Sequence, residues 1–319
     1  MSKHVFITGA NGFVGRHAVE YFLKQGWRVS VLSRTAENLP KNMTFYTFPE
    51  DFEAAPWQDA LENVDVVLHL AARAHVLKET AQDPVAAFWR LNQGFTAVLG
   101  AAAAKCGVKQ FVYLSSAGVY GKKSGVIPFR EAEDTPMPHN AYTASKLAGE
   151  DTLWQIMEET GLPVTVIRPP LMYGTGVRAN FARLTSLVQK GIPLPFAKGQ
   201  NSRSFLAIEN LLDFIKTACL NKKAYGQVFN VSDGEDLSTH QLCQKLASAL
   251  GKKPFFMPFP RIVARALLTV LGKKNLYYGL WRSFQLDISK AEEQLNWKPR
   301  QSVHVGLKNY IENLLNPPA

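Results

Sequence analysis

The stretch Val5-Phe6-Ile7-Thr8-Gly9-Ala10-Asn11-Gly12-Phe13-Val14-Gly15 decides the fold of this chain. A short apolar run leads into a turn with three glycines, and an amphipathic segment follows to residue 26, so the order predicts a strand, a loop and a helix. Gly9 permits the tight turn, Gly12 lets the backbone approach a pyrophosphate, and Gly15 lets the helix pack close to the strand. The helix N-terminus then offers unpaired N–H groups and the positive end of its dipole to phosphates.

The context separates this loop from a chance glycine-rich turn. The spacing is G-x-x-G-x-x-G, a weak signal alone, but a second strand-like run at residues 27–32 comes where a βαβ unit needs it. That run ends in Ser33-Arg34, where NAD-binding folds usually place an acidic residue on the ribose 2′-hydroxyl. A guanidinium binds a 2′-phosphate instead, so Arg34, with Ser33 as a hydroxyl donor, favours NADP(H). The alternative is a solvent-facing Arg34 with NAD(H) bound.

Composition limits the class of protein. The 319 residues suit one large or two modest domains, and 46% hydrophobic residues suffice for a full core. Cys106, Cys219 and Cys243 form no C-x-x-C pair and indicate reduced thiols in a cytoplasmic protein. The first residues run straight into a strand without a signal-peptide pattern, and no apolar run approaches the ~18 residues of a membrane span. We expect no metal site.

The net charge of +10 has two interpretations, an anionic ligand or partner, or simply solvated surface lysines. The charges are spread along the chain without a nucleic-acid-binding motif, so small phosphorylated ligands are favoured over nucleic acid. The segment 252–282 mixes bases with many aromatic residues. It could contact a membrane surface peripherally, although such a stretch more often combines core packing with a substrate wall.

Further candidate site residues follow later strands. The apolar run 64–70 ends in His69-Leu70-Ala71-Ala72, where small residues would let a dinucleotide pass. A catalytic role is one interpretation of His69, but a histidine at such a strand end is more often structural. The strand at 111–116 ends in Ser115-Ser116, and ligands of doubly wound sheets bind at such carboxyl ends. Tyr142 and Lys146 lie at i and i+4 on one helix face, where the lysine would lower the pKa of the phenol for proton exchange with an alcohol or carbonyl.

The predicted fold class is α/β, a Rossmann-type doubly wound parallel sheet with a smaller, interleaved C-terminal substrate domain. Residues 1–168 would form the dinucleotide-binding domain, because the strand–helix alternation changes after Arg168. A strand near 227–231 would return to the main sheet. Residues 169–319 would form the second domain.

With its three glycines, Ser116, Tyr142 and Lys146 together, the chain resembles the extended short-chain dehydrogenases/reductases of the nucleotide-sugar epimerase/dehydratase group. The resemblance covers essentially the whole chain and includes Leu295-Asn296-Trp297-Lys298-Pro299. Residues 229–239 and 282–289 are similar to a UDP-glucose 4-epimerase-like subgroup that includes reductases forming UDP-N-acetylquinovosamine for surface polysaccharide. Members pair through two helices, here 85–106 and 142–160, so a homodimer is expected.

The resemblance also implies roles for single residues. Tyr142 would exchange the proton, Lys146 would hold the ribose and tune the phenol, and Ser116 would hydrogen-bond the reacting oxygen. The implied cofactor-binding residues are Gly9, Asn11, Gly12, Phe13, Val14, Gly15, Ser33, Arg34, Leu70, Ala71, Ala72, Asn92, Tyr142, Lys146 and Pro169. The implied substrate-binding residues are Ser116, Tyr142, Asn180, Leu194, Phe196, Arg203 and Arg282, with Phe196 equally expected as a core residue.

The resemblance leaves three functions to weigh, and sugar dehydration is not among them. Dehydration is disfavoured because Ala117 and Gly118 follow the catalytic hydroxyl where sugar dehydratases carry an acidic pair. The first hypothesis is net reduction of a UDP-4-keto-6-deoxy-N-acetylhexosamine at C4, towards which Arg34 leans. The second is a UDP-glucose or UDP-N-acetylglucosamine 4-epimerase that retains NAD⁺. The third, a non-catalytic dinucleotide sensor, is opposed by the intact set of Ser116, Tyr142 and Lys146.

Overall fold

A computed structural model describes residues 2–37, 39–74, 81–196 and 199–316. Seven parallel strands form the main sheet in the order β3-β2-β1-β4-β5-β6-β9. These strands are β1 (His4–Thr8), β2 (Arg28–Ser33), β3 (Thr44–Thr47), β4 (Val66–His69), β5 (Gln110–Leu114), β6 (Val164–Arg168) and β9 (Gln227–Asn230). The order reverses between β1 and β4, and ligands of such sheets bind outside the strand ends at that point. This is the Rossmann-like α/β fold that the sequence predicts.

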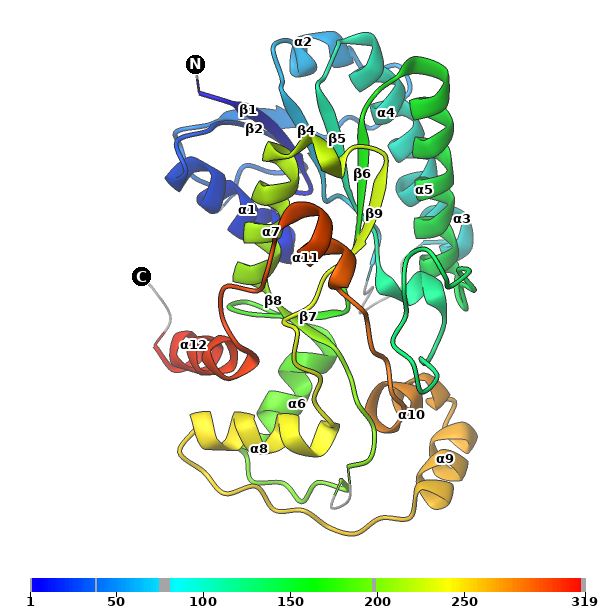
Figure 1. Cartoon of the computed structure of the whole chain (residues 1–319), viewed down its shortest axis with the longest axis vertical. Coiled ribbons are helices and arrows are strands. Elements are labelled where there is room, and N and C mark those ends of the chain that lie inside the picture. Colours follow the sequence, from blue (N-terminus) through cyan, green and yellow to red (C-terminus); the bar gives the residue numbers. More distant parts are fainter. Residues whose placement is uncertain (1, 38, 75–80, 197–198, 317–319) are drawn as a thin grey trace.

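Helices cover both faces of the sheet (Figure 1). On one face lie α1 (Phe13–Lys24), α7 (Ile208–Leu220) and α11 (Ser289–Leu295). On the other lie α2 (Trp57–Leu61), α4 (Phe95–Lys105) and α5 (Ala141–Thr160). The segment before α4 consists of α3 (Pro84–Trp89) and a π-helical turn, η1 (Arg90–Gly94). Two short 3₁₀ helices, η2 (Ala117–Tyr120) and η3 (Lys222–Ala224), follow β5 and α7.

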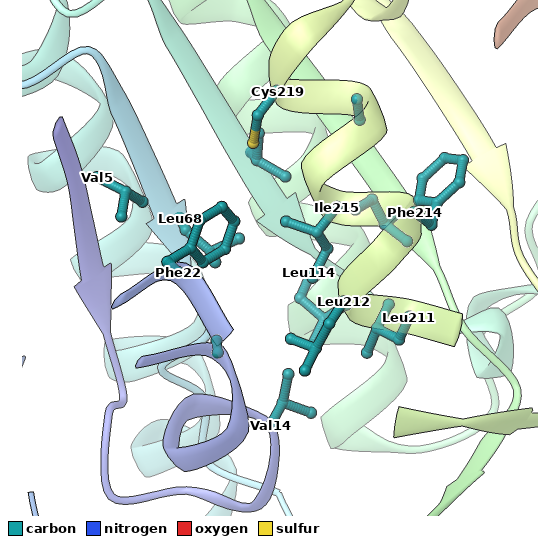
Figure 2. Packing of buried hydrophobic residues seen from close by; sticks show 14 of the residues in the cluster. Val5, Val14, Phe22, Leu68, Leu114, Leu211, Leu212, Phe214, Ile215 and Cys219 are labelled. Carbon is teal, nitrogen blue, oxygen red and sulfur yellow. The ribbon is translucent and has the colours of Figure 1, made fainter. Parts of the chain in front are cut away.

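The core on the first face joins segments far apart in the sequence. Figure 2 shows Phe22 of α1 and Leu211, Leu212 and Ile215 of α7 over the sheet. All of these side chains are buried. The sheet strands are nearly continuous apolar runs, as expected where helices cover both faces. Strand β9 pairs with β6 through the register Thr165↔Gln227, so the chain returns to the sheet after residues 169–226 have left it.

The smaller part of the molecule is built around a two-stranded sheet with its own buried cluster. Its elements are β7 (Leu171–Tyr173), β8 (Phe205–Ala207), α6 (Ala179–Gln189), α8 (Thr239–Ala249) and α12 (Val303–Leu315). Two further helices, α9 (Arg261–Val270) and α10 (Lys274–Trp281), lie at the end of the molecule farthest from β1 and β2 (Figure 1).

Two properties of the described residues bear on the class of protein. No helix among them is both long and apolar enough to cross a bilayer. In the same part of the chain, no group of three or more His, Cys, Asp or Glu side chains could hold a metal ion.

Candidate active site

The glycine loop is packed too tightly for any other residue at two of its positions. A Cβ atom on Gly15 would lie 2.1 Å from the carbonyl oxygen of Gly9, and one on Gly9 would lie 2.7 Å from the backbone nitrogen of Ala71. Gly9 also has φ +71°, a conformation that favours glycine. The loop therefore lies directly against the chain that follows β4.

The N-terminus of α1 is open to a ligand. Its cap residue is Gly12, no side chain caps the helix, and no acidic residue lies in its first turn. Two polar atoms beside it, Oδ1 of Asn11 and Nε of Arg16, are buried without a hydrogen-bond partner. Free helix N–H groups, a guanidinium and an amide fit the phosphates of a dinucleotide. The side chain of Val14 lies in the core, so only its backbone is available to a ligand.

The end of β2 lies next to this loop. Asn11 Nδ2 donates to the carbonyl oxygen and hydroxyl of Thr35, at 2.8 and 3.0 Å. Ser33 is buried and Arg34 is exposed. These residues flank the position at which a dinucleotide-binding loop receives the adenosine ribose.

His69 has a structural role, as expected. Its Nδ1 lies 2.7 Å from the hydroxyl of Thr8 and its Nε2 lies 2.9 Å from the hydroxyl of Thr96. The same Thr8 oxygen accepts from the backbone nitrogens of Leu70 and Ala71. Complete burial holds the pKa of His69 well below its usual value, so the ring is neutral.

Asn92 supports the same loop from the π-helical turn. Its side chain is fully buried, its Oδ1 accepts from the backbone nitrogen of Arg73 at 2.7 Å, and its Nδ2 donates to the Arg73 carbonyl and to Ser145 Oγ. Because both amide atoms are used by the chain itself, Asn92 positions the loop after β4 against α5. A direct contact with a cofactor stays a prediction.

Ser116 lies next to the start of α5, the helix that carries both Tyr142 and Lys146. Ser116 follows β5, and its Oγ accepts from the backbone nitrogen of Gly118 at 3.1 Å. Tyr142 and Lys146 lie on successive turns of α5, which begins with a capping box at Asn140. Burial raises the pKa of Tyr142, and its hydrogen bond with Ser116 partly opposes that rise.

The expected lowering of the Tyr142 pKa by Lys146 is wrong for this structure. Burial is the largest influence on the phenol and disfavours its charged form. Burial also lowers the pKa of Lys146 to about 7, with Glu150 opposing the change. The Lys146 ammonium lies 3.9 Å from the centre of the Tyr113 ring. Because the pKa of Lys146 is about 7, a small change in its surroundings alters its charge at neutral pH.

One cavity of about 590 Å³ joins the glycine loop to this pair of hydroxyls. Of the residues predicted to bind or react, it is lined by Asn11, Gly12, Phe13, Ala72, Ser116, Tyr142, Pro169 and Arg203. Lys146 is buried behind the wall, and Arg34 lies outside it. These eight predicted residues thus face one common space. Cavity contacts of the other expected cofactor residues stay predictions; they are Gly9, Val14, Gly15, Ser33, Arg34, Leu70, Ala71, Asn92 and Lys146.

Arg203 closes the far side of the cavity. Its Nη1 donates to the carbonyl oxygens of Arg282 and Tyr278, at 2.9 and 3.3 Å, and its guanidinium lies over the ring of Phe284. Burial lowers its pKa to about 10, so it still carries its charge at neutral pH. Among the described residues no carboxylate pairs with it. A cationic group held in this way suits an anionic ligand.

Other expected substrate residues lie apart from the cavity. Leu194 and Phe196 are buried in the core of the smaller part, where Phe196 packs on Trp281. Asn180 is exposed on α6, one residue after the lining residue Ala179. Arg282 does not line the cavity. Their predicted substrate contacts stay predictions.

Several lining residues were not singled out by the sequence analysis. They are Arg16, Lys122, His139 and Arg178. Asn275 and Tyr278 also line the cavity, and they belong to the segment 252–282 that was expected to include a substrate wall. Of the first four, Arg16 alone had a local signal, since it lies in the first turn of the helix that the glycine loop opens. The other three come from loops that only the tertiary fold brings to the site.

The comparisons with known proteins agree with this geometry. A family model described as the NAD dependent epimerase/dehydratase family matches residues 5–232. A UDP-glucose 4-epimerase of Vibrio cholerae is 38% identical over 99% of this chain and 96% of its own. The crystal structure of a Thermotoga maritima UDP-glucose 4-epimerase with UDP-glucose has a TM-score of 0.78 and 28% identity, covering 98% of each chain.

A second solved structure supports the fold alone. The UDP-N-acetylglucosamine 4-epimerase of Bacillus cereus has a TM-score of 0.78 at 22% identity and covers 99% of this chain and 100% of its own. The family match spans the glycine loop, Ser116, Tyr142 and β9, and the Vibrio relative matches nearly end to end. The chain therefore belongs to the NAD-dependent epimerase/dehydratase family, enzymes of the extended short-chain dehydrogenase/reductase type.

Proposed function

We propose that this enzyme is a UDP-sugar 4-epimerase acting on UDP-glucose or UDP-N-acetylglucosamine. The observation that carries the proposal is the single cavity that Asn11, Gly12, Ser116 and Tyr142 share. The likeness to the Vibrio cholerae and Thermotoga maritima 4-epimerases supports the substrate class.

In this proposal, separate residues of the chain bind the cofactor, bind the substrate and transfer the proton. The glycine loop and the α1 N-terminus hold the dinucleotide phosphates, and Arg203 faces the sugar-nucleotide diphosphate. When bound, the nicotinamide supplies hydride acceptance and donation at C4. Tyr142 takes the proton of the 4-hydroxyl when its phenol is ionised and returns that proton from the neutral phenol, while Ser116 orients the same oxygen. Lys146, one turn further along α5, would hold the cofactor ribose.

Dehydration fits the site poorly. Gly118 stands where an acidic side chain would be needed, and a Cβ atom there would lie 2.9 Å from Cγ2 of Thr143. A larger residue therefore requires the side chain of Thr143, in the first turn of α5, to shift. This argues for chemistry at C4 without elimination of water.

Net reduction of a UDP-4-keto-6-deoxy-N-acetylhexosamine is the second candidate. The observation that favours it is the lack of an acidic residue at the end of β2, where Ser33 and Arg34 would accept the 2′-phosphate of NADP(H). A net reductase must exchange its oxidised cofactor, whereas an epimerase recycles NAD⁺.

The test is to follow both reactions by proton NMR in D₂O. UDP-glucose and UDP-N-acetylglucosamine are incubated with the purified protein and NAD⁺, and an epimerase forms the C4 epimer without deuterium at C4. In parallel, UDP-4-keto-6-deoxy-N-acetylglucosamine is given with NADPH or NADH. Stoichiometric loss of reduced cofactor without epimerisation would move the assignment to the reductase, and no change in either assay would overturn both.

A further inference from the structure

All formally charged side chains in the stretch from Leu237 to Leu286 are positive. This stretch contains eight lysines and arginines and no aspartate or glutamate, so all 26 acidic residues of the chain lie elsewhere. Helices α8, α9 and α10 all fall within it. The cavity uses only part of this stretch, and α9 contributes nothing to the cavity wall.

Helix α9 turns an apolar face to solvent. The aliphatic pairs Ile262/Val263, Ala266/Leu267 and Val270/Leu271 recur every four residues, which places them along one side of the helix. Ile262 and Val270 are 84% and 85% exposed, whereas Ala264 on the opposite side is buried. A solvated helix normally has the reverse arrangement.

Basic side chains border this face. Arg261 and Arg265 lie four residues apart along one edge of α9, and the pairs Lys252/Lys253 and Lys273/Lys274 precede and follow the helix. None of these six forms an ion pair among the described residues. Phe255 and Met257, 57% and 41% exposed, extend the apolar surface towards Lys252. We call this surface, residues 252–274, the basic–apolar face.

We propose that the basic–apolar face docks on an anionic lipid bilayer, with α9 lying in the plane of the headgroups. Exposed aliphatic residues on one side of a helix, bordered by lysine and arginine, suit the boundary between acyl chains and negative headgroups. A second copy of the chain would bring the same positive charges together. Nucleic acid would match the charge but leave the aliphatic side chains in water.

Docking would also place one wall of the cavity near the bilayer. Helix α10 packs on α9 and contributes Asn275, Tyr278 and Gly279 to the lining. The lipid surface thus becomes a neighbour of the candidate active site. The proposal rests on the surface chemistry and does not depend on which reaction the enzyme catalyses.

Vesicle flotation tests the proposal directly. The full chain is mixed with phosphatidylcholine vesicles, or with equimolar phosphatidylcholine and phosphatidylglycerol, and the bound fraction is measured after flotation. We expect binding to the anionic vesicles that weakens with salt. The double variant Ile262→Glu/Val270→Glu should bind more than about tenfold more weakly, because two aliphatic anchors are lost. Lys273→Gln/Lys274→Gln should weaken binding about fivefold per charge at low salt.

The matched control is Val305→Glu/Leu314→Glu on α12, where both residues are 43–44% exposed. It adds the same two negative charges on a different helix and should float like the unmodified protein. Circular dichroism and thermal melting show whether each variant is folded. Three outcomes would each overturn the proposal. The unmodified chain does not float, both Glu double variants lose vesicle binding equally, or Ile262→Glu/Val270→Glu converts a dimer to a monomer. Binding of a duplex DNA probe through this face without flotation would also overturn it, in favour of nucleic acid.

Discussion

The phenol of Tyr142 can be tested by removing one oxygen. Tyr142→Phe keeps the ring and the packing on α5 but leaves no group to move the proton of the sugar hydroxyl. We expect kcat to fall by about 10²–10⁴-fold. Cofactor binding, measured by fluorescence quenching, and the thermal midpoint should stay unchanged. A variant that turns over normally would remove Tyr142 from the mechanism.

Arg34 decides the cofactor prediction. Because its exposed guanidinium would contact a 2′-phosphate, Arg34→Asp should weaken NADPH binding about tenfold and leave NADH binding unchanged or improved. Titrations of the two reduced cofactors measure this ratio. Equal effects on both would show that Arg34 does not read the 2′-position.

Lys146 predicts a dependence of stability on pH. Its pKa in the folded chain is about 7, against 10.5 in the unfolded chain, so between these values the unfolded chain binds more protons. The stability that this group contributes therefore rises as the pH rises through that window. Lys146→Met should raise the free energy of unfolding by about 2 kcal/mol at neutral pH while abolishing activity. The gain should shrink towards about pH 10.

Urea denaturation at several pH values measures this difference. The control is Lys24→Met, because the Lys24 side chain is 78% exposed and its substitution should change stability little at any pH. A gain from Lys146→Met that is independent of pH would show that the ammonium is not destabilised by burial.

At the scale of the element, the contact between the glycine loop and α1 leaves the least room for an added side chain. A Cβ atom on residue 15 would lie 2.1 Å from Gly9 O and 2.8 Å from Ala10 Cα, both backbone atoms that cannot yield. Gly15→Ala should destabilise the protein by about 3 kcal/mol and abolish dinucleotide binding.

Gly26→Ala is the matched control for this substitution. It lies at the other end of α1 with φ +75°, and its Cβ atom would meet nothing within 4 Å. Only the cost of the left-handed conformation remains, about 1 kcal/mol, and cofactor binding should persist. Similar thermal midpoints for the two variants would contradict the packing argument.

The parts of the site that sequence could predict are local in origin. The glycine loop, Ser116 and Tyr142, which line the cavity, each follow from a short pattern at the end of one strand or the start of one helix. The role of Asn92 and the cavity contributions of His139 and Arg178 depend on contacts between distant elements, which no local pattern encodes. The direction of the Tyr142 pKa also escaped prediction, because burial is a property of the folded chain.

At the scale of the whole molecule, self-association through the helices of the second face stays a prediction. Helices α4 and α5 pack together there, and Val85 and Trp89 of the adjoining α3 are 52% and 41% exposed. Light scattering should give twice the mass of one chain. Trp89→Glu should weaken the dimer at least about tenfold, since buried tryptophans dominate interfaces. Leu314→Glu on α12 should leave it intact, and a monomeric parent protein would refute the pairing.

The pairing of β9 with β6 has a consequence for biosynthesis. Until Gln227–Asn230 leaves the ribosome, β6 is an open edge whose backbone groups have no neighbour on that side. At about 5–20 residues per second, the intervening segment takes several seconds to appear. The nascent sheet of residues 4–168 is therefore exposed to wrong strand partners during that interval, so its completion is timed by translation of residues 169–230.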